Sequence, residues 1–166
     1  PNNSVAFLTE DEYPRPDELQ SAKDGPEINS AIRRTPPVIV GSSFLADSLK
    51  ASWKIDAAVL PVTVDIDRYV QNSPQHRRFI SMLQPYTHKG IDLVLQLADA
   101  MPERTFRIPG GIGENYRRNK PAILSRHNII HSQFIPAPQE IYNESFLVLV
   151  PSLWNEAYSR VVIEAL

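Results

Sequence analysis

The sequence predicts an α/β protein in which helices cover both faces of parallel sheets. Short β-branched or fully apolar runs, typical of strands buried on both faces, alternate with segments of helical periodicity. This alternation occurs twice, on either side of a polar connector at residues 64–75. The 166 residues are enough for one good core or two small ones. Because 42% of the residues are hydrophobic, the 15 prolines against 6 glycines indicate rigid loop junctions rather than disorder.

In the first half, the pattern becomes regular after a Pro-Pro pair. Val38–Val40 is β-branched and predicts a buried strand. Ser42 can cap a helix that runs to about Trp53, because Leu45 and Leu49 fall on one of its faces. The other elements expected in this half are strands at Ser4–Leu8 and Ala57–Leu60 and short helices at 17–23 and 27–33.

The second half repeats the alternation. The helix expected at Lys89–Met101 has Ile91, Leu95 and Ala98 at helical spacing. The chain stops at Leu166 without a helix C-cap, so we expect a fragment of a longer protein. The remaining expected elements are strands at Phe79–Leu83, Thr105–Ile108, Asn128–Ile130 and Phe146–Val150 and helices at Gln139–Ser145 and Ser159–Leu166.

Composition excludes several classes of function. The net charge of −2 and the pI near 6.1 give no electrostatic footprint for nucleic acid or an anionic membrane. The absence of cysteine excludes disulfides and thiolate metal sites. The longest apolar run, Phe146–Val150, is far shorter than the ~20 residues of a membrane span, and no signal-peptide pattern opens the chain. We therefore expect a cytoplasmic protein.

The clearest candidate site follows the apolar run at Phe146–Val150. Ligands of open parallel sheets bind beyond the carboxyl ends of the strands, and the next helix would begin there, near Ser159. The N-terminus of that helix would favour an anion. Glu156 and Glu164 flank this turn, and a carboxylate can accept hydrogen bonds from two hydroxyl groups of a sugar diol.

The same region resembles a known family. The Glu-x7-Glu element after an apolar strand and Pro-Ser looks like the donor-site signature of family 4 retaining glycosyltransferases, which have the GT-B fold. Val59–Tyr69 is similar to the family's V-I-P-N-G-V-D-x-x-x-F segment, and the region from Phe79 to Leu95 resembles the first strand, Lys-Gly turn and helix of its C-terminal domain. Together the segments cover roughly residues 36–166.

The resemblance implies two Rossmann-like parallel-sheet domains, here incomplete. Residues 1–66 would be the C-terminal part of the acceptor-side domain, 67–77 the linker, and 78–166 a truncated donor-binding domain. Gln84 departs from the family pattern, because many members have Arg five residues before the Lys of the Lys-Gly turn. Thr63 replaces the usual Gly of the linker motif.

The resemblance also implies roles for individual residues. Lys89 would pair with the donor diphosphate, and Glu164 would bind the ribose hydroxyls of the nucleotide. Glu156, the catalytic candidate, would contact hydroxyls of the transferred sugar. The remaining donor-binding residues would be Gly110 and Gly111 beside the base or phosphates, Ser159 with its backbone N–H, and Tyr158 packed on the donor.

The function so implied is transfer of a hexose-type sugar from a nucleoside diphosphate sugar to an acceptor hydroxyl, with retention of anomeric configuration. The family context implies neither a metal ion nor another cofactor. Its partners would be the nucleotide sugar and a carbohydrate or lipid-linked acceptor, with room for peripheral membrane contact in the longer protein. The fragment alone would be inactive. One alternative is a non-catalytic nucleotide-sugar binding module; another is a GT-B sugar-nucleotide epimerase, which lacks this Glu-x7-Glu context.

Other polar residues have simpler interpretations. His127 and His131 flank a strand-like segment without a third ligand nearby, so a metal site is disfavoured. Asp65 and Asp67 could form an acid/base pair, but a solvated hinge is favoured. We expect Trp154 to pack at a domain edge rather than to stack on a sugar.

Overall fold

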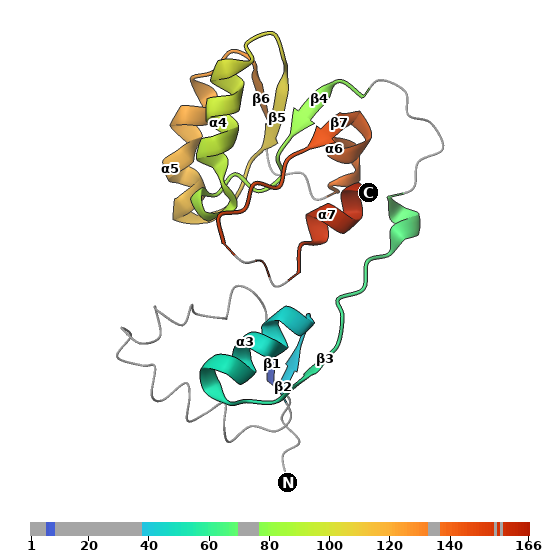
Figure 1. Ribbon diagram of the computed structural model, residues 1–166. Coiled ribbons are helices and arrows are strands. Elements are labelled where there is room, and N and C mark those ends of the chain that lie inside the picture. The colour runs from blue at the N-terminus through green and yellow to red at the C-terminus, as the bar shows by residue number, and fades with distance from the viewer. Residues whose placement is uncertain (1–5, 9–37, 70–76, 133–136, 155, 157) are drawn as a thin grey trace. The chain divides into compact units, whose positions relative to one another are not determined.

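The computed structural model describes residues 6–8, 38–69, 77–132, 137–154, 156 and 158–166. The chain divides into two compact units, Pro1–Thr63 with Glu156–Ser159, and Val64–Asn155 with Arg160–Leu166. Each unit has its own parallel sheet among the described residues, as expected (Figure 1). The predicted domain ranges, 1–66, 67–77 and 78–166, stay predictions.

The first unit is a three-stranded sheet with one helix. Its strands are β1 (Ala6–Leu8), β2 (Val38–Val40) and β3 (Ala57–Val59), parallel and in the order β1-β2-β3. The helix α3 (Ser43–Trp53) begins where expected, because the Ser42 hydroxyl accepts a hydrogen bond of 3.2 Å from the Leu45 N–H. The core of this unit consists of Val38, Val40, Leu45, Leu49, Trp53 and Ile55. The helices expected at 17–23 and 27–33 lie outside the described residues.

The second unit is a four-stranded parallel sheet in the order β6-β5-β4-β7. Its strands are β4 (Phe79–Ser81), β5 (Phe106–Pro109), β6 (Ile129–Ser132) and β7 (Ser145–Val148). Its helices are η1 (Ile66–Arg68), η2 (Thr87–Lys89), α4 (Ile91–Ala100), α5 (Gly113–Leu124), α6 (Gln139–Glu144) and α7 (Arg160–Ala165). The chain moves outward from β4 to β6 and then returns to β7 on the other side of β4, so the strand order reverses between β4 and β7.

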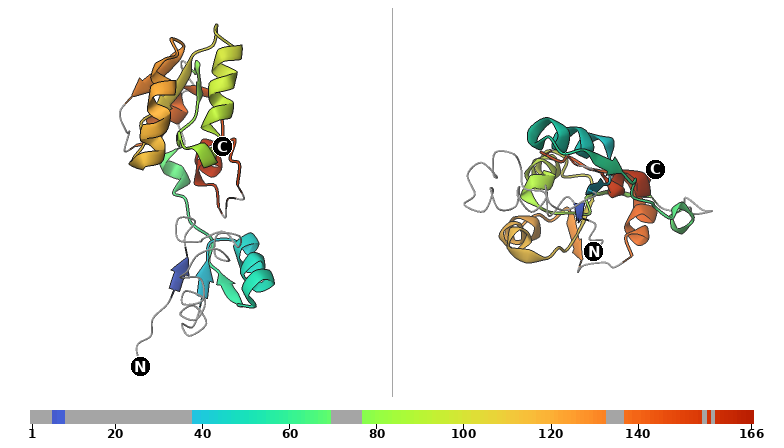
Figure 2. Two further views of the ribbon diagram at one scale, coloured as in Figure 1. Left: turned by 90° about the vertical axis from the view of Figure 1, so that its left-hand side faces the viewer. Right: turned by 90° about the horizontal axis from the view of Figure 1, so that it is seen from below.

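Helices α4 and α5 cover one face of this sheet, and α6 lies on the other side (Figure 2). The core beneath α4 and α5 is made by Ile80, Met82, Ile91, Val94, Leu95, Ala98, Phe106, Ile108, Ile123 and Ile129. It contains all three residues of the apolar face predicted for α4. The α/β fold with parallel sheets is therefore confirmed.

Two expectations in this unit are wrong. The helix predicted from Lys89 begins at Ile91, because Gly90 has a φ of +83° and separates it from the short helix η2. The run Phe146–Val150 is not a fully buried strand: Phe146 and Leu147 are 48% and 45% exposed. The cause is that β7 lies at the edge of the sheet, with a register irregularity opposite the Phe79–Ile80 step of β4.

Helix α5 was not predicted at all. It contains Pro121, which argues against a helix, and only Asn119 and Ile123 of its twelve residues are buried. Most of its surface is polar, so the apolar periodicity that reveals a helix is missing. No helix among the described residues is both long and apolar enough to span a membrane.

Candidate functional site

A cavity of about 330 Å³ opens at the carboxyl edge of the four-stranded sheet. We call it the carboxyl-edge cavity. It is lined by segments that follow β4 and β5 and by helices α6 and α7, with the residues Leu83, Gln84, Pro109, Gly110, Pro138, Ile141, Tyr142, Arg160, Val161 and Glu164. Open α/β sheets bind ligands beyond the carboxyl ends of their strands at the point where the strand order reverses. The volume is at the lower end of the range for small-molecule sites.

Glu164 is the buried anion of this cavity. Its side chain is only 5% exposed, and each carboxylate oxygen has a partner. The Tyr142 hydroxyl donates to Oε2 at 2.8 Å, and Arg160 Nη2 donates to Oε1 at 2.8 Å. A buried carboxylate stays charged only where such partners compensate for the lost water. The structure therefore holds Glu164 ready as a hydrogen-bond acceptor.

The partners of Glu164 keep their protons. Burial, followed by the hydrogen bond to Glu164, raises the pKa of the Tyr142 hydroxyl. The same carboxylate raises the pKa of the Arg160 guanidinium, chiefly through their hydrogen bond. Both groups are thus donors at neutral pH.

Lys89 lies at the end of η2, in the turn that precedes α4. Its side chain is buried, and Nζ lies 4.9 Å from the centroid of the Trp154 ring. His88 meets the same ring edge-on, with centroids 4.8 Å apart, and the His88 carbonyl accepts a 3.0 Å hydrogen bond from the Leu153 N–H. Trp154 therefore packs against the Lys-Gly turn through a cation–π contact. Lys89 does not line the carboxyl-edge cavity.

Gly90 lets this turn form. A Cβ atom at this position would lie 2.1 Å from the Pro151 carbonyl oxygen. The positive φ of Gly90 is also unfavourable for any other residue. The backbone after β7 can therefore approach the Lys-Gly turn closely only because residue 90 is glycine.

Helix α5, which the sequence did not reveal, supports the same turn. Asn115 Oδ1 accepts a 2.9 Å hydrogen bond from the Thr87 N–H. The buried Asn119 donates through Nδ2 to the Pro85 carbonyl at 3.1 Å and to the Thr87 hydroxyl at 3.3 Å. Two asparagines one helical turn apart thus fix the backbone that carries Lys89.

The two glycines after β5 have different surroundings. Gly110 lines the carboxyl-edge cavity and donates its N–H to the Ser132 carbonyl at 2.7 Å. Gly111 lies outside the cavity lining; a Cβ there would come within 3.2 Å of Tyr116 and of the Tyr86 hydroxyl. Because the Tyr86 hydroxyl also accepts from the Ile112 N–H at 3.3 Å, the loop is held by packing as well as by hydrogen bonding.

The other residues predicted for the site belong to the first unit. Glu156, Tyr158 and Ser159 are half-buried and lie within its segment Glu156–Ser159. Their roles at a donor stay predictions.

The simpler interpretations can be checked at individual residues. His131 donates from Nδ1 to the Ile108 carbonyl at 2.8 Å and accepts at Nε2 from the Tyr116 hydroxyl at 2.9 Å, so both ring nitrogens are engaged. In the part of the chain that the structure describes, no three His, Cys, Asp or Glu side chains could hold a metal ion together. Asp65 pairs with Arg68 at the exposed start of η1.

Two residues of the carboxyl-edge cavity were missed from sequence. Arg160 precedes Glu164 by four residues, and this i,i+4 spacing on a helix does predict an ion pair. Tyr142 is 22 residues away from Glu164 and has no local signal, because only the return of the chain to the sheet brings α6 next to α7.

Comparison with known proteins identifies the fold type of the chain but not its family. No protein-family profile and no curated protein match the chain. HepE from Anabaena, in complex with UDP and glucose, is 17% identical with a TM-score of 0.73, and the match covers 97% of this chain and 49% of HepE. The same protein with UDP-glucose gives 18% and 0.72, over 97% of this chain and 50% of HepE.

Two further solved structures are also similar. TarM is 19% identical with a TM-score of 0.67, over 87% of this chain and 30% of TarM. A glycosyltransferase from Rickettsia africae is 18% identical with a TM-score of 0.65, over 84% of this chain and 45% of that protein. The chain thus spans between about a third and a half of the length of these proteins. Together, these likenesses show that the chain has a two-unit parallel α/β fold of the GT-B type.

Proposed function

We propose that this chain is the nucleotide-sugar-binding portion of a glycosyltransferase that transfers a hexosyl group to an acceptor hydroxyl with retention of configuration. The observation that carries the proposal is Glu164, a charged carboxylate buried at the carboxyl edge where the strand order reverses. A fold shared with a protein solved with UDP-glucose supports the assignment of the ligand class.

In this proposal, each residue contacts a different part of the donor. Glu164 accepts hydrogen bonds from the ribose hydroxyls, and Gly110 lets the donor approach the backbone closely. Lys89 neutralises the diphosphate as a point charge, and Ser159 offers its backbone N–H to it. Glu156 contacts hydroxyls of the transferred sugar, and Tyr158 packs against the donor. The family context implies that no metal ion takes part.

The chemistry asked of these residues is positioning and charge stabilisation. A nucleoside diphosphate leaves when the anomeric carbon–oxygen bond breaks, and cationic groups that contact it stabilise the developing charge. The acceptor would be a carbohydrate or a lipid-linked molecule. We also propose that the longer protein acts in the cytoplasm.

Calorimetry with UDP, GDP and ADP tests the binding step. We expect one of them to bind the chain, and Glu164→Gln to weaken binding by about 1–3 kcal/mol, because the ribose hydroxyls lose a charged acceptor. The matched control is Glu140→Gln, an exposed glutamate on α6 outside the cavity lining, which should bind like the wild type. Equal affinities of wild type and Glu164→Gln would remove Glu164 from the site.

A second assay separates an enzyme from a binding module. The longer protein should release the nucleoside diphosphate from a nucleotide sugar in the presence of an acceptor. Binding without any transfer or release, over a panel of sugar and lipid-linked acceptors, would favour the non-catalytic alternative.

A further inference from the structure

The carboxylate of Glu164 has acceptor capacity left after its protein contacts. An ionised carboxylate offers about four lone-pair positions. The Tyr142 hydroxyl occupies one on Oε2, and Arg160 Nη2 occupies one on Oε1. The Tyr69 hydroxyl also interacts with this carboxylate, and burial together with this carboxylate raises the pKa of Tyr69. At least one of the four positions therefore remains for a ribose hydroxyl.

The two protein partners differ in how firmly they can fix the carboxylate. The Arg160 side chain is 63% exposed and reaches Glu164 across one helical turn, a type of pair that is weak in water. Tyr142 is 8% exposed and has only two side-chain torsions, so the position of its hydroxyl is closely restricted. Its raised pKa keeps that proton in place. Tyr142 is thus the more rigid of the two donors.

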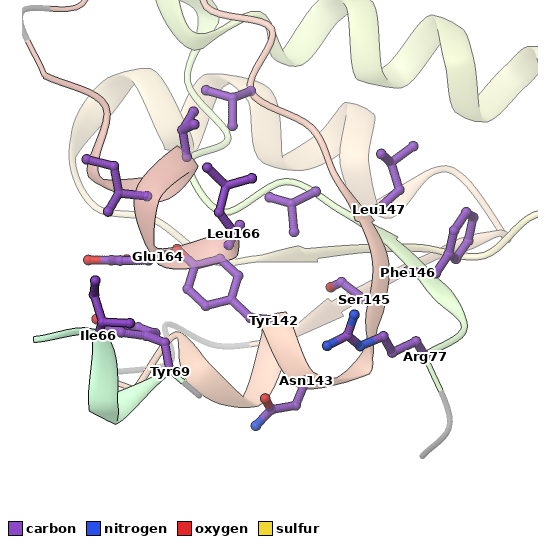
Figure 3. Close-up of a pocket in the computed structure, with 15 residues that line it drawn as sticks. Ile66, Tyr69, Arg77, Tyr142, Asn143, Ser145, Phe146, Leu147, Glu164 and Leu166 are labelled. Atoms are coloured by element: carbon purple, nitrogen blue, oxygen red, sulfur yellow. Dashed lines mark hydrogen bonds between the residues drawn. The ribbon is translucent and has the colours of Figure 1, made fainter. Parts of the chain in front are cut away.

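The Tyr142 ring is itself fixed from a third element (Figure 3). Tyr69, the residue that follows η1, meets it edge-on with centroids 5.8 Å apart and planes at 61°. Tyr142 and Glu164 also line a second cavity of about 500 Å³, bounded by η1, β7 and α7, so their hydrogen bond lies in the wall between two hollows. Because the Glu164 carboxylate borders a cavity on each side, its orientation depends on its hydrogen bonds more than on close packing.

We infer that Tyr142 is the positioning residue that orients the Glu164 carboxylate for a vicinal ribose diol. The inference rests on the proposed function. Tyr142 does not touch the ribose; it occupies one lone pair of Oε2 and so sets the direction of the other. Without the Tyr142 hydroxyl, the carboxylate can rotate about its terminal torsion, and its remaining acceptor capacity no longer faces the ribose hydroxyls.

The test compares ribose and 2′-deoxyribose ligands, because only a correctly aimed carboxylate distinguishes them. Dissociation constants are measured by calorimetry for UDP and 2′-deoxy-UDP, and for the guanine and adenine pairs, with the wild type and with Tyr142→Phe. In the wild type, we expect the ribose ligand to bind about tenfold more tightly, equivalent to about 1.4 kcal/mol. In Tyr142→Phe, the ratio should fall to about twofold or less.

Ser145→Ala is the matched control. It removes another buried hydroxyl of the same unit, one that donates to the Ile141 carbonyl at 2.5 Å and accepts from the Ser81 hydroxyl at 2.6 Å. It should lower the melting temperature at least as much as Tyr142→Phe, yet keep the tenfold ratio. A double variant Tyr142→Phe/Glu164→Gln should have the same ratio as Glu164→Gln alone, because Tyr142 acts through Glu164.

The outcomes are distinguishable. If Tyr142→Phe weakens both ligands equally and keeps their ratio, Tyr142 only supports the fold and the inference is wrong. If the ratio falls but falls equally in Ser145→Ala, general destabilisation is the cause and the inference is again wrong. If no nucleoside diphosphate binds the wild type, both the proposed function and the inference are wrong.

Discussion

Comparing Gly90→Ala with Gly113→Ala separates the steric cost of a new methyl group from the conformational cost of a positive φ. The new methyl group at position 90 would lie 2.1 Å from the Pro151 carbonyl oxygen, in a backbone with a φ of +83°. Gly113 has a similar φ of +78°, but nothing lies within 4 Å of a Cβ built there. Gly113→Ala therefore measures the conformational cost alone, about 1–2 kcal/mol. Gly90→Ala pays the same cost and a steric one.

The steric cost can be worked out from the contacts around the turn. The Pro151 oxygen must move by about 1 Å before the contact reaches the 3.0–3.4 Å range, which is tight but tolerated. That movement strains the hydrogen bond from Leu153 to His88, worth about 0.5–1.5 kcal/mol. It also separates Lys89 from Trp154, a contact worth about 0.5–2 kcal/mol. Gly90→Ala should thus destabilise the unit by about 1–3.5 kcal/mol more than Gly113→Ala.

Urea unfolding followed by Trp154 fluorescence measures this difference. The chain has two tryptophans, and Trp53 lies in the core of the first unit, so all three proteins carry Trp53→Phe to make Trp154 the only reporter. The free energy of unfolding of the second unit is then compared between the parent and the two glycine variants. If Gly90→Ala and Gly113→Ala destabilise equally, the close approach of Pro151 to residue 90 does not exist in solution.

Three further outcomes follow from contacts of the second unit. Lys89→Ala should weaken nucleoside diphosphate binding by about 1.5–3 kcal/mol in calorimetry and leave nucleoside binding unchanged, since only the diphosphate loses a charge-assisted hydrogen bond; unchanged diphosphate affinity would remove Lys89 from the site. Asn119→Ala should cost about 1–3 kcal/mol in thermal unfolding, because the Pro85 carbonyl loses its donor, whereas Lys120→Ala on the exposed side of the same helix should be neutral. Arg126 donates to both carboxylate oxygens of Asp99, and these hydrogen bonds hold the pKa of Asp99 below its usual value. The pair therefore stabilises the fold above about pH 4, and this stabilisation is lost as the pH falls through the lowered pKa of Asp99 in the folded protein. Melting temperatures of wild type and Asp99→Asn should therefore converge between about pH 5 and pH 2, and a constant gap would contradict the assignment.

Elements whose sequence signals are local were predicted correctly. The strand Val38–Val40 and the helix from Ser43 to Trp53 have β-branched residues, a serine cap and an apolar face within a few positions. Prediction failed where tertiary context decides. Helix α5 is stabilised by Asn119, whose partners lie more than thirty residues away in the chain. The apolar run at Phe146 gave no sign that its strand would lie at a sheet edge.

The candidate site shows the same division. Glu164 stands out from the sequence through its context, and the structure places it in a cavity at the sheet edge. Its partner Tyr142 could not be found from the sequence, because no local pattern around position 142 indicates a contact with position 164. Lys89 was identified as a cation of the turn, but its contact with Trp154 depends on the path of the chain after β7.

The exposure of β7 at the edge of its sheet has a consequence for the behaviour of this chain in concentrated solution. Residues 146–150 are Phe-Leu-Val-Leu-Val, with no charge, no proline and high β-propensity. The first three lie in β7, which pairs on only one side within the described sheet. Such segments promote intermolecular strand pairing and aggregation. A lysine at position 146 would enter a site that is already 48% exposed, so it should raise colloidal stability at little cost to the fold.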